Sequence, residues 1–310
     1  MGSERISAED LDRLEHWARW GVEFANKSRE MAASTEVGSL HVGVVGVVAP
    51  TVEALMLDGL VSIRPVVAPP GLVHIAPKVH TANVDYLAVA RHATHINCEI
   101  AFFNRPEHPF TVEVQHSCCW HLIALLKIRG HQVYCPASSS QPWDLIAGAP
   151  DRSVEMRLLD DKPARISLRP PTPISAGDIQ WIDRHYMTAF GLRSINVSRR
   201  FGLAFNLAYR WNLTDDYRVG LTLLWAGLEA LFGDQNDHPV TSTLATRISG
   251  WLPSTSDAHV RRLYRTRCDA VHGRDLDASL SSQVMLETER LLQDALIVAI
   301  ERNRVPLPDW

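Results

Sequence analysis

The segment 216-DYRVGLTLLWAGLEALF-232 decides the architecture of the C-terminal half of the chain. Projected at about 100° per residue, its large apolar side chains share one face of a helix: Leu221, Leu224, Leu228, Leu231 and Phe232. Gly233 follows at the place where such a helix would end. The pattern predicts a helix whose apolar face lies in a hydrophobic core.

Helical periodicity continues on both sides of this segment. Stripes of apolar residues at helical spacing occur near 177–190, 194–212, 216–232, 241–252, 257–272 and 279–302. Breaks fall at Gly233, Pro239, Pro253 and Gly273, so several of the connections are short. Short connections between amphipathic helices predict an antiparallel, all-α bundle over residues 176–310.

The preceding part of the chain has a different pattern. Short Val-rich and Ile-rich runs, broken by proline and glycine, predict strands at 42–48, 60–67, 71–76, 110–114, 131–135 and 164–168. Helices are expected near 83–92 and 119–128, a long loop at 137–151 and a linker at 170-PPTP-173. Residues 37–175 therefore read as a β-rich domain, preceded by a helix within residues 1–36. The predicted fold class is α+β.

Composition excludes several classes of protein. The 310 residues are 46% hydrophobic and 21% charged, which is typical of a globular chain and not of a disordered or fibrous one. The net charge of −4 gives no global basic field, so any contact with RNA must come from a local patch. No apolar run reaches about 18 residues and the first residues lack a signal-peptide core. With five cysteines and no CxxC, we expect a cytoplasmic protein that contacts no membrane.

The segment 260-VRRLYRTRCDAVHG-273 contains the residues best suited to chemistry. On a helix, Arg267 falls inside an apolar stripe, where a guanidinium is costly without a partner. The opposite side forms a basic face that either contacts the RNA backbone or is simply solvated: Arg261, Arg262 and Arg265.

Arg267 and His272 form an Arg-x4-His motif whose chemistry suits RNA cleavage without a metal. A histidine can take a proton from the 2′-hydroxyl or give one to the leaving 5′-oxygen, and an arginine can stabilise the charged transition state. Five residues are about 140° apart on a helix, so the two side chains converge only if the helix ends there, as Gly273 favours. The alternative is an arginine paired with a carboxylate and a histidine that caps the helix.

Four segments together resemble the HEPN superfamily, particularly its ApeA-like group. They are 224-LWAGLEALFG-233, 244-LATRISGWL-252, 265-RTRCDAVHGR-274 and 284-VMLETERLLQDALIVAIER-302, and the similar region covers roughly residues 178–302. The resemblance implies a metal-independent endoribonuclease without cofactor, in which two protomers pair and place two Arg–His motifs in one cleft. It implies that Arg267 and His272 are catalytic and that the products carry a 2′,3′-cyclic phosphate and a 5′-hydroxyl.

The resemblance also suggests a biological role and partners. It points to anti-phage defence or a toxin-like effector that acts on tRNA or another cellular RNA, with an unidentified trigger bound by the N-terminal domain. The chain departs from the family in one place, because many members have Asn, Asp or His directly after the arginine, whereas here Cys268 precedes Asp269. The alternative function is a non-catalytic HEPN module that dimerises or binds RNA or a nucleotide.

Four further residues are expected to support the pair. Glu229 and Arg247 match charged positions of the similar segments, and either orient Arg267 and His272 or form an ion pair between helices. Tyr264 belongs to the apolar stripe with its hydroxyl near the site, and Asp269 lies beside Cys268.

No metal is expected in the N-terminal domain. The cluster 116-HSCCWH-121, with Cys98 and Cys135, has no standard zinc spacing. We expect adjacent cysteines to point to opposite faces of a strand and to be buried. No other constellation in residues 38–170 points to a small-molecule enzyme or sensor.

Overall fold

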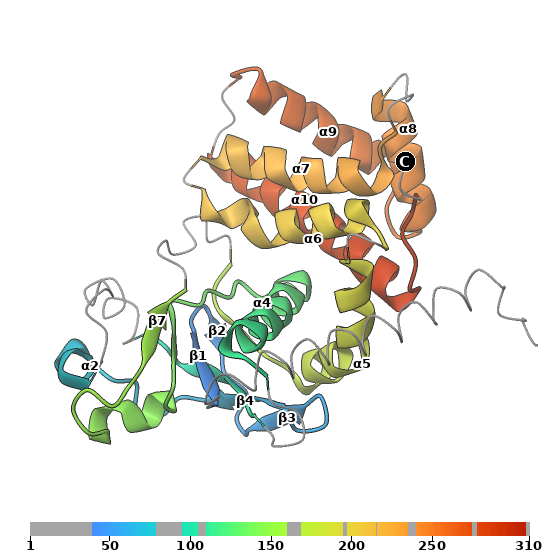
Figure 1. Ribbon diagram of the computed structural model, residues 1–310. Coiled ribbons are helices and arrows are strands. Elements are labelled where there is room, and N and C mark those ends of the chain that lie inside the picture. Colours follow the sequence, from blue (N-terminus) through green and yellow to red (C-terminus); the bar gives the residue numbers. More distant parts are fainter. Residues whose placement is uncertain are drawn as a thin grey trace, which may run out of the picture.

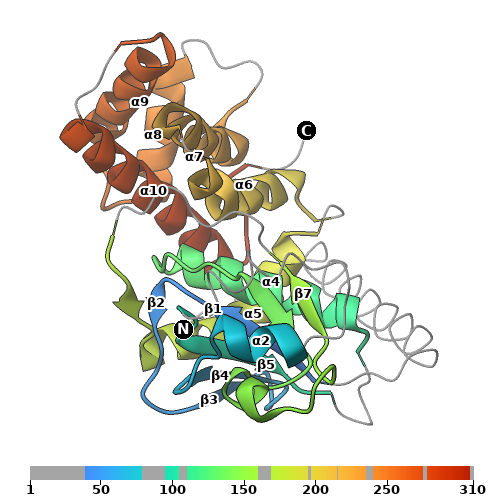
Figure 2. The same ribbon diagram turned by 90° about the vertical axis from the view of Figure 1, so that its left-hand side faces the viewer.

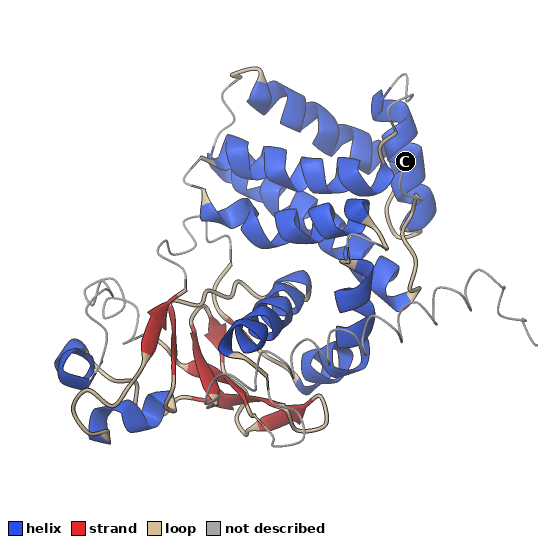
Figure 3. Ribbon diagram, viewed as in Figure 1, coloured by secondary structure: helices blue, strands red, loops and turns tan. Residues whose placement is uncertain are grey.

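A computed structural model describes residues 39–78, 95–104, 110–159, 169–194, 197–214, 216–234, 240–274 and 278–307. The N-terminal region contains an antiparallel sheet, and the part that follows is helical (Figure 1, Figure 3). This arrangement confirms the α+β class. Three predicted elements, the helix within 1–36, the helix at 83–92 and the strand at 164–168, lie outside the described residues.

The main sheet has six antiparallel strands in the order β3-β4-β5-β1-β6-β7. Their bounds are β1 Leu40–Val44, β3 Ala54–Met56, β4 Val61–Pro65, β5 Cys98–Phe102, β6 Ala137–Ser139 and β7 Met156–Leu158. The predicted strands at 42–48 and 60–67 are confirmed by β1 and β4. A separate parallel pair joins β2 (Val47–Val48) to β8 (Thr172–Pro173), so the expected linker at 170–173 contributes a short strand.

The two faces of the sheet pack differently. Val42 and Ile100 lie opposite each other and are buried in the same core as helix α4 (Val112–Ile128). The other face is packed against Trp143, and a Cβ at Gly43 would lie 2.4 Å from Ile96 Cδ1 and 2.9 Å from the indole ring. Glycine at position 43 therefore lets the tryptophan approach the sheet.

Two predicted strands are helical instead. Residues 110–114 enter helix α4, because Thr111 caps its first turn by accepting a hydrogen bond from the backbone N–H of Val114 (3.3 Å). Residues 71–76 enter helix α2 (Leu72–Lys78), in which Ile75 is buried and Val73 is exposed. Short runs rich in valine and isoleucine do not distinguish a strand from one or two turns of helix.

Two further segments also differ from expectation. Within 131–135, the described structure has only an isolated bridge between Tyr134 and Val45. The expected loop at 137–151 contains β6 and a 3₁₀ helix, η1 (Trp143–Gly148). The expected helix at 119–128 is confirmed as the second half of α4.

All six predicted C-terminal helices are present. They are α5 (Ala176–Leu192), α6 (Arg199–Arg210), α7 (Tyr217–Phe232), α8 (Val240–Trp251), α9 (Asp257–Val271) and α10 (Ala278–Glu301), with a 3₁₀ turn η2 (Trp211–Leu213) after α6. Capping side chains start four of them: Ser175, Ser198, Asp216 and Ser256.

Helix α7 is the centre of the helical part and packs against α6, α8, α9 and α10. The five residues of its predicted apolar face are all buried. Helix α4 contacts α5, α6 and α10, so one hydrophobic core continues from the sheet into the helices, and Figure 2 shows α4 between them. Among the described residues, none of the helices has the length and apolar character needed to span a membrane.

Candidate active site at the end of helix α9

Helix α9 ends where the sequence predicted. Gly273 has a φ of +80°, its backbone N–H bonds the carbonyl of Ala270 (3.2 Å), and the N–H of Arg274 bonds the carbonyl of Asp269 (3.0 Å). These two bonds form a Schellman motif, which requires a left-handed residue at position 273. His272 is the C-cap residue and its side chain is exposed. The helix therefore stops at the residue whose side chain the proposed chemistry needs.

Arg267 lies between α9 and α7 with 21% of its side chain exposed. Its Nε is buried and has no hydrogen-bond partner in the described part of the chain. One terminal nitrogen is 3.8 Å from Oε1 of Glu229, and the guanidinium carbon is 5.6 Å from the centre of the Tyr264 ring. The prediction that Arg267 belongs to the apolar side of α9 is thus confirmed.

Helix α7 contributes Trp225 and Glu229 to the surroundings of Tyr264 and Arg267. The Trp225 and Tyr264 rings meet edge to face at 5.0 Å. Burial raises the pKa of Glu229 and outweighs Arg267, which lowers it. Burial, and then the negative charge of Glu229, raises the pKa of Tyr264. We call Trp225, Glu229, Tyr264 and Arg267 the α7–α9 cluster.

The other two supporting residues have different contacts. Arg247 donates a hydrogen bond to the carbonyl of Phe232 (2.8 Å), and Arg200 donates to the carbonyls of Ala230 and Gly233 (3.1 and 2.7 Å). Both cations therefore stabilise the C-terminal end of α7, where the helix dipole is negative. Asp269 accepts a hydrogen bond from Arg274 at 2.6 Å.

The basic face of α9 is partly neutralised. Arg261 pairs with Asp257 of the same helix at 2.6 Å. Arg262 pairs with Glu287 of α10 and thereby ties the two helices together. Arg265 is exposed and makes no ion pair with the residues that the structure describes. Of the three arginines predicted to contact RNA, Arg265 is the one whose charge is not paired with a carboxylate of the described residues.

The cysteine- and histidine-rich segment 116–121 belongs to helix α4 and not to a strand, so the expected strand geometry of Cys118 and Cys119 is wrong. His121 is buried, stacks on Phe205 at 5.3 Å and hydrogen-bonds the carbonyl of Tyr186. All five cysteines are free, and burial raises the pKa of Cys98 to about 12. Within the described ranges, no group of three or more His, Cys, Asp or Glu residues could hold a metal ion.

Sequence reasoning missed a buried polar network in the sheet. Glu99 is fully buried and its carboxylate accepts from Arg64 Nε (3.0 Å) and the backbone N–H of Trp143 (2.7 Å). His41 Nδ1 lies 2.7 Å from the same carboxylate. Despite burial, these partners keep the pKa of Glu99 below its usual range. The only advance signal is one acidic residue within the apolar strand 98-CEIAF-102.

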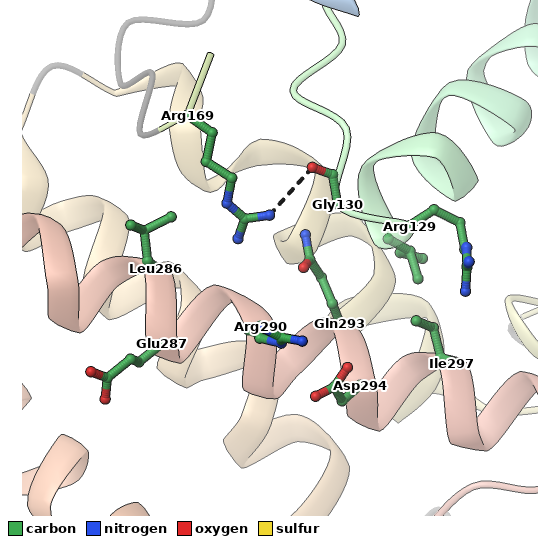
Figure 4. Close-up of a pocket in the computed structure, with 10 residues that line it drawn as sticks. Arg129, Gly130, Arg169, Leu286, Glu287, Arg290, Gln293, Asp294 and Ile297 are labelled. Atoms are coloured by element: carbon green, nitrogen blue, oxygen red, sulfur yellow. Dashed lines mark hydrogen bonds between the residues drawn. The ribbon is translucent and has the colours of Figure 1, made fainter. Parts of the chain in front are cut away.

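Sequence reasoning also missed two cavities, and neither is lined by Arg267 or His272. One lies between the end of α4 and α10 and is lined by Arg129, Arg169, Arg290 and their neighbours (Figure 4). The second is lined by residues of α4, α6 and η2. Comparison of the chain with family models, with curated proteins and with solved structures finds no match.

Proposed function

We propose that the chain is a metal-independent endoribonuclease of HEPN type that uses Arg267 and His272. The observation that supports this best is the state of Arg267, whose buried Nε has no hydrogen-bond partner among described residues and whose nearest carboxylate is 3.8 Å away. A structural arginine at this depth is normally saturated by close contacts. A guanidinium with unused donors is suited to bind a phosphate.

In the proposed reaction the RNA phosphate lies between Arg267 and His272. The 2′-oxygen loses its proton and attacks phosphorus, the bond from phosphorus to the 5′-oxygen breaks, and that oxygen gains a proton. His272 takes or gives one of these protons, which its exposed position at the helix end allows. Arg267 stabilises the additional negative charge on the phosphorane-like transition state. The products carry a 2′,3′-cyclic phosphate and a 5′-hydroxyl.

The proposal includes a homodimer. The reaction needs two proton transfers, and two histidines can carry out one each. In a dimer, the partner's His272 would lie on the other side of the phosphate. Val271 and Leu280, on either side of the α9–α10 connection, are 47% and 37% exposed in the single chain. Apolar side chains next to the proposed active site are suited to such an interface.

The biological part of the proposal follows the family resemblance. A nuclease that acts on tRNA or another cellular RNA would serve as an anti-phage effector or toxin in the cytoplasm. The sheet-containing region would then respond to a trigger.

The first test is incubation of the purified chain with total tRNA in EDTA, with mapping of the product ends. We expect cyclic-phosphate ends from the wild type and none from His272→Ala. His259→Ala is the matched control, since His259 lies at the opposite end of the same helix. Cleavage by a folded His272→Ala variant at the wild-type rate would overturn the mechanism.

The second candidate function is a non-catalytic module that dimerises or binds RNA or a nucleotide. The pairing of Arg267 with Glu229 favours it, because a carboxylate competes with a phosphate for the guanidinium. RNA binding that Arg267→Ala leaves unchanged, with no cleavage by the wild type, would support this function instead.

A further inference from the structure

A groove of about 610 Å³ lies where helix α4 meets α6 and η2. Its lining includes Trp120 of α4, Arg193 after α5, and Phe205, Tyr209 and Arg210 of α6, together with Leu159 after β7. The volume is typical of small-molecule sites, which span about 300–1,000 Å³. The groove thus joins the sheet-containing region to the helices, away from the α7–α9 cluster.

The described lining of the groove carries positive charge. Arg193 and Arg210 line it, and none of the described lining residues is an aspartate or a glutamate. Neither arginine makes an ion pair with a carboxylate in the part of the chain that the structure describes. A concave surface with two unpaired guanidinium groups attracts an anion.

Arg193 is held in place by aromatic rings. Its guanidinium carbon lies 5.8 Å from the centre of the Phe190 ring and 5.7 Å from that of Phe205. Arg193 is half-buried, and this burial lowers the pKa of its guanidinium. The start of α6 packs closely on this residue, because a Cβ at Gly202 would lie 3.0 Å from the Arg193 carbonyl oxygen. A desolvated, fixed arginine is suited to bind an anionic ligand.

Aromatic surface lies beside these charges. Trp120 and Tyr209 both line the groove, are partly exposed and meet edge to face at 5.3 Å. The Lys127 ammonium lies 4.1 Å from the Tyr209 ring centre and adds positive charge behind it. Indole and phenol rings at a wet surface are the side chains on which nucleobases stack.

The cavity between the end of α4 and α10 provides a contrast within the same molecule. Its arginines are matched by acids, because Arg169 pairs with Glu289 at 2.7 Å and Arg129 with Asp178 at 3.0 Å. Glu287 and Asp294 lie in its wall beside Arg290, as Figure 4 shows. That cavity is electrostatically balanced and has no aromatic lining residue. Of the two cavities, the groove alone combines aromatic rings with arginines that make no ion pair with the residues the structure describes.

We propose that the groove between α4 and α6 binds a nucleotide, with its base against Trp120 and Tyr209 and its phosphates on Arg193 and Arg210. A nucleotide is the ligand class that unites a flat aromatic ring with a phosphate. The site is independent of RNA cleavage by Arg267 and His272.

Fluorescence anisotropy of mant-ADP with the full chain tests the proposal. We expect saturable binding that ADP displaces, and that adenosine or inorganic phosphate displaces only at far higher concentration. Arg210→Gln should weaken binding by about tenfold or more, since a charge-assisted hydrogen bond contributes about 1.5–3 kcal/mol. Arg210 is exposed, so this variant should fold, and Trp120→Leu tests the aromatic contact separately. Arg290→Gln in the balanced cavity is the matched control and should bind as the wild type does.

Three results with mant-ADP would overturn the proposal. They are the absence of saturable mant-ADP binding, equal binding by the wild type and the Arg210→Gln and Trp120→Leu variants, and loss of binding in Arg290→Gln. A short single-stranded RNA that binds more than about tenfold more tightly and loses affinity in the same variants would also overturn it, because the groove would then be an RNA track. Loss of tRNA cleavage in His272→Ala leaves these measurements unaffected, so the two proposals fail separately.

Discussion

The guanidinium of Arg267 lies 3.8 Å from the carboxylate of Glu229, across the contact between α9 and α7. Several other ion pairs among the described residues are much closer, as in Arg261–Asp257 at 2.6 Å and Arg169–Glu289 at 2.7 Å, whereas Arg157–Glu113 is also 3.8 Å apart. At 3.8 Å the pair is held by charge and not by a short hydrogen bond. The contact with Glu229 therefore leaves the donors of the guanidinium without a short hydrogen bond to this carboxylate.

This geometry makes a prediction for Glu229→Gln. The free energy of unfolding should change by less than about 1 kcal/mol, because both side chains are partly exposed. Under conditions in which the wild type cleaves RNA, kcat should fall by about 10- to 100-fold while KM changes little, since a misplaced guanidinium loses contact with the transition state. Initial-rate kinetics with a defined RNA measure both quantities.

Glu287→Gln is the control for this experiment. Glu287 pairs with Arg262 between α9 and α10, so its loss tests whether any weakened contact of α9 reduces cleavage. We expect an unchanged kcat. An equal loss of kcat in both variants would show that Glu229 acts only through the stability of α9.

The Schellman motif at the end of α9 makes a second prediction. Gly273→Ala forces an L-residue into a φ of +80°, which should lower the free energy of unfolding by about 1 kcal/mol. The strain acts on the C-cap residue His272, so RNA cleavage should fall more than this modest destabilisation explains. Thermal unfolding and cleavage rates on the same samples separate the two effects.

Gly250→Ala is the matched substitution. Gly250 lies in helix α8 with open space around its would-be Cβ, so alanine should leave cleavage unchanged and raise the unfolding temperature slightly. Wild-type cleavage by Gly273→Ala would mean that the position of His272 is unimportant.

The sequence predicted the helical part of the chain better than the sheet. Long apolar stripes identify each C-terminal helix from its own residues. The runs at 71–76 and 110–114 are too short for this, and in the second the deciding signal is the Thr111 cap and not the valines that follow. Local patterns are reliable only where an element spans several turns.

The charged sites could not be predicted from the local sequence, because their residues come together only in the tertiary structure. Glu99 meets His41 and Arg64, which are 58 and 35 residues away, only because the strand register brings them together. The groove likewise joins Trp120, Arg193 and Arg210 from three separate elements. By contrast, Arg267 and His272 lie on one helix, so their spacing and the Gly273 ending could be deduced from the sequence.

The buried carboxyl of Glu289 leads to a third prediction, which concerns how the stability depends on pH. Burial raises its pKa from the usual 4.5 to about 7, although Arg169 and Lys127 lower it. Since the folded pKa is the higher one, the carboxyl contributes stability that is present below about pH 4.5 and is lost as the pH rises through about 7. Glu289→Gln should therefore reduce the loss of stability between about pH 5 and 8 by about 1–3 kcal/mol.

Urea unfolding of both proteins at the two pH values measures this difference. Glu53→Gln, which replaces an exposed carboxyl, should behave as the wild type does. An unchanged pH dependence in Glu289→Gln would show that Glu289 stays ionised beside Arg169 at pH 5.

His121 should give a pH dependence of the opposite sign. It is enclosed by Tyr186, Phe190 and Phe205, and this burial lowers its pKa from 6.5 to about 3. The folded pKa is the lower one, so the neutral ring contributes stability that is present above about pH 6.5 and is lost as the pH falls towards 3.

His121→Phe keeps an aromatic ring in the cage and cannot be protonated. Between about pH 7 and 4 it should therefore lose about 1–3 kcal/mol less stability than the wild type. Urea unfolding at both pH values tests this, with the exposed His74→Ala as control, and identical acid sensitivity of His121→Phe and the wild type would contradict it.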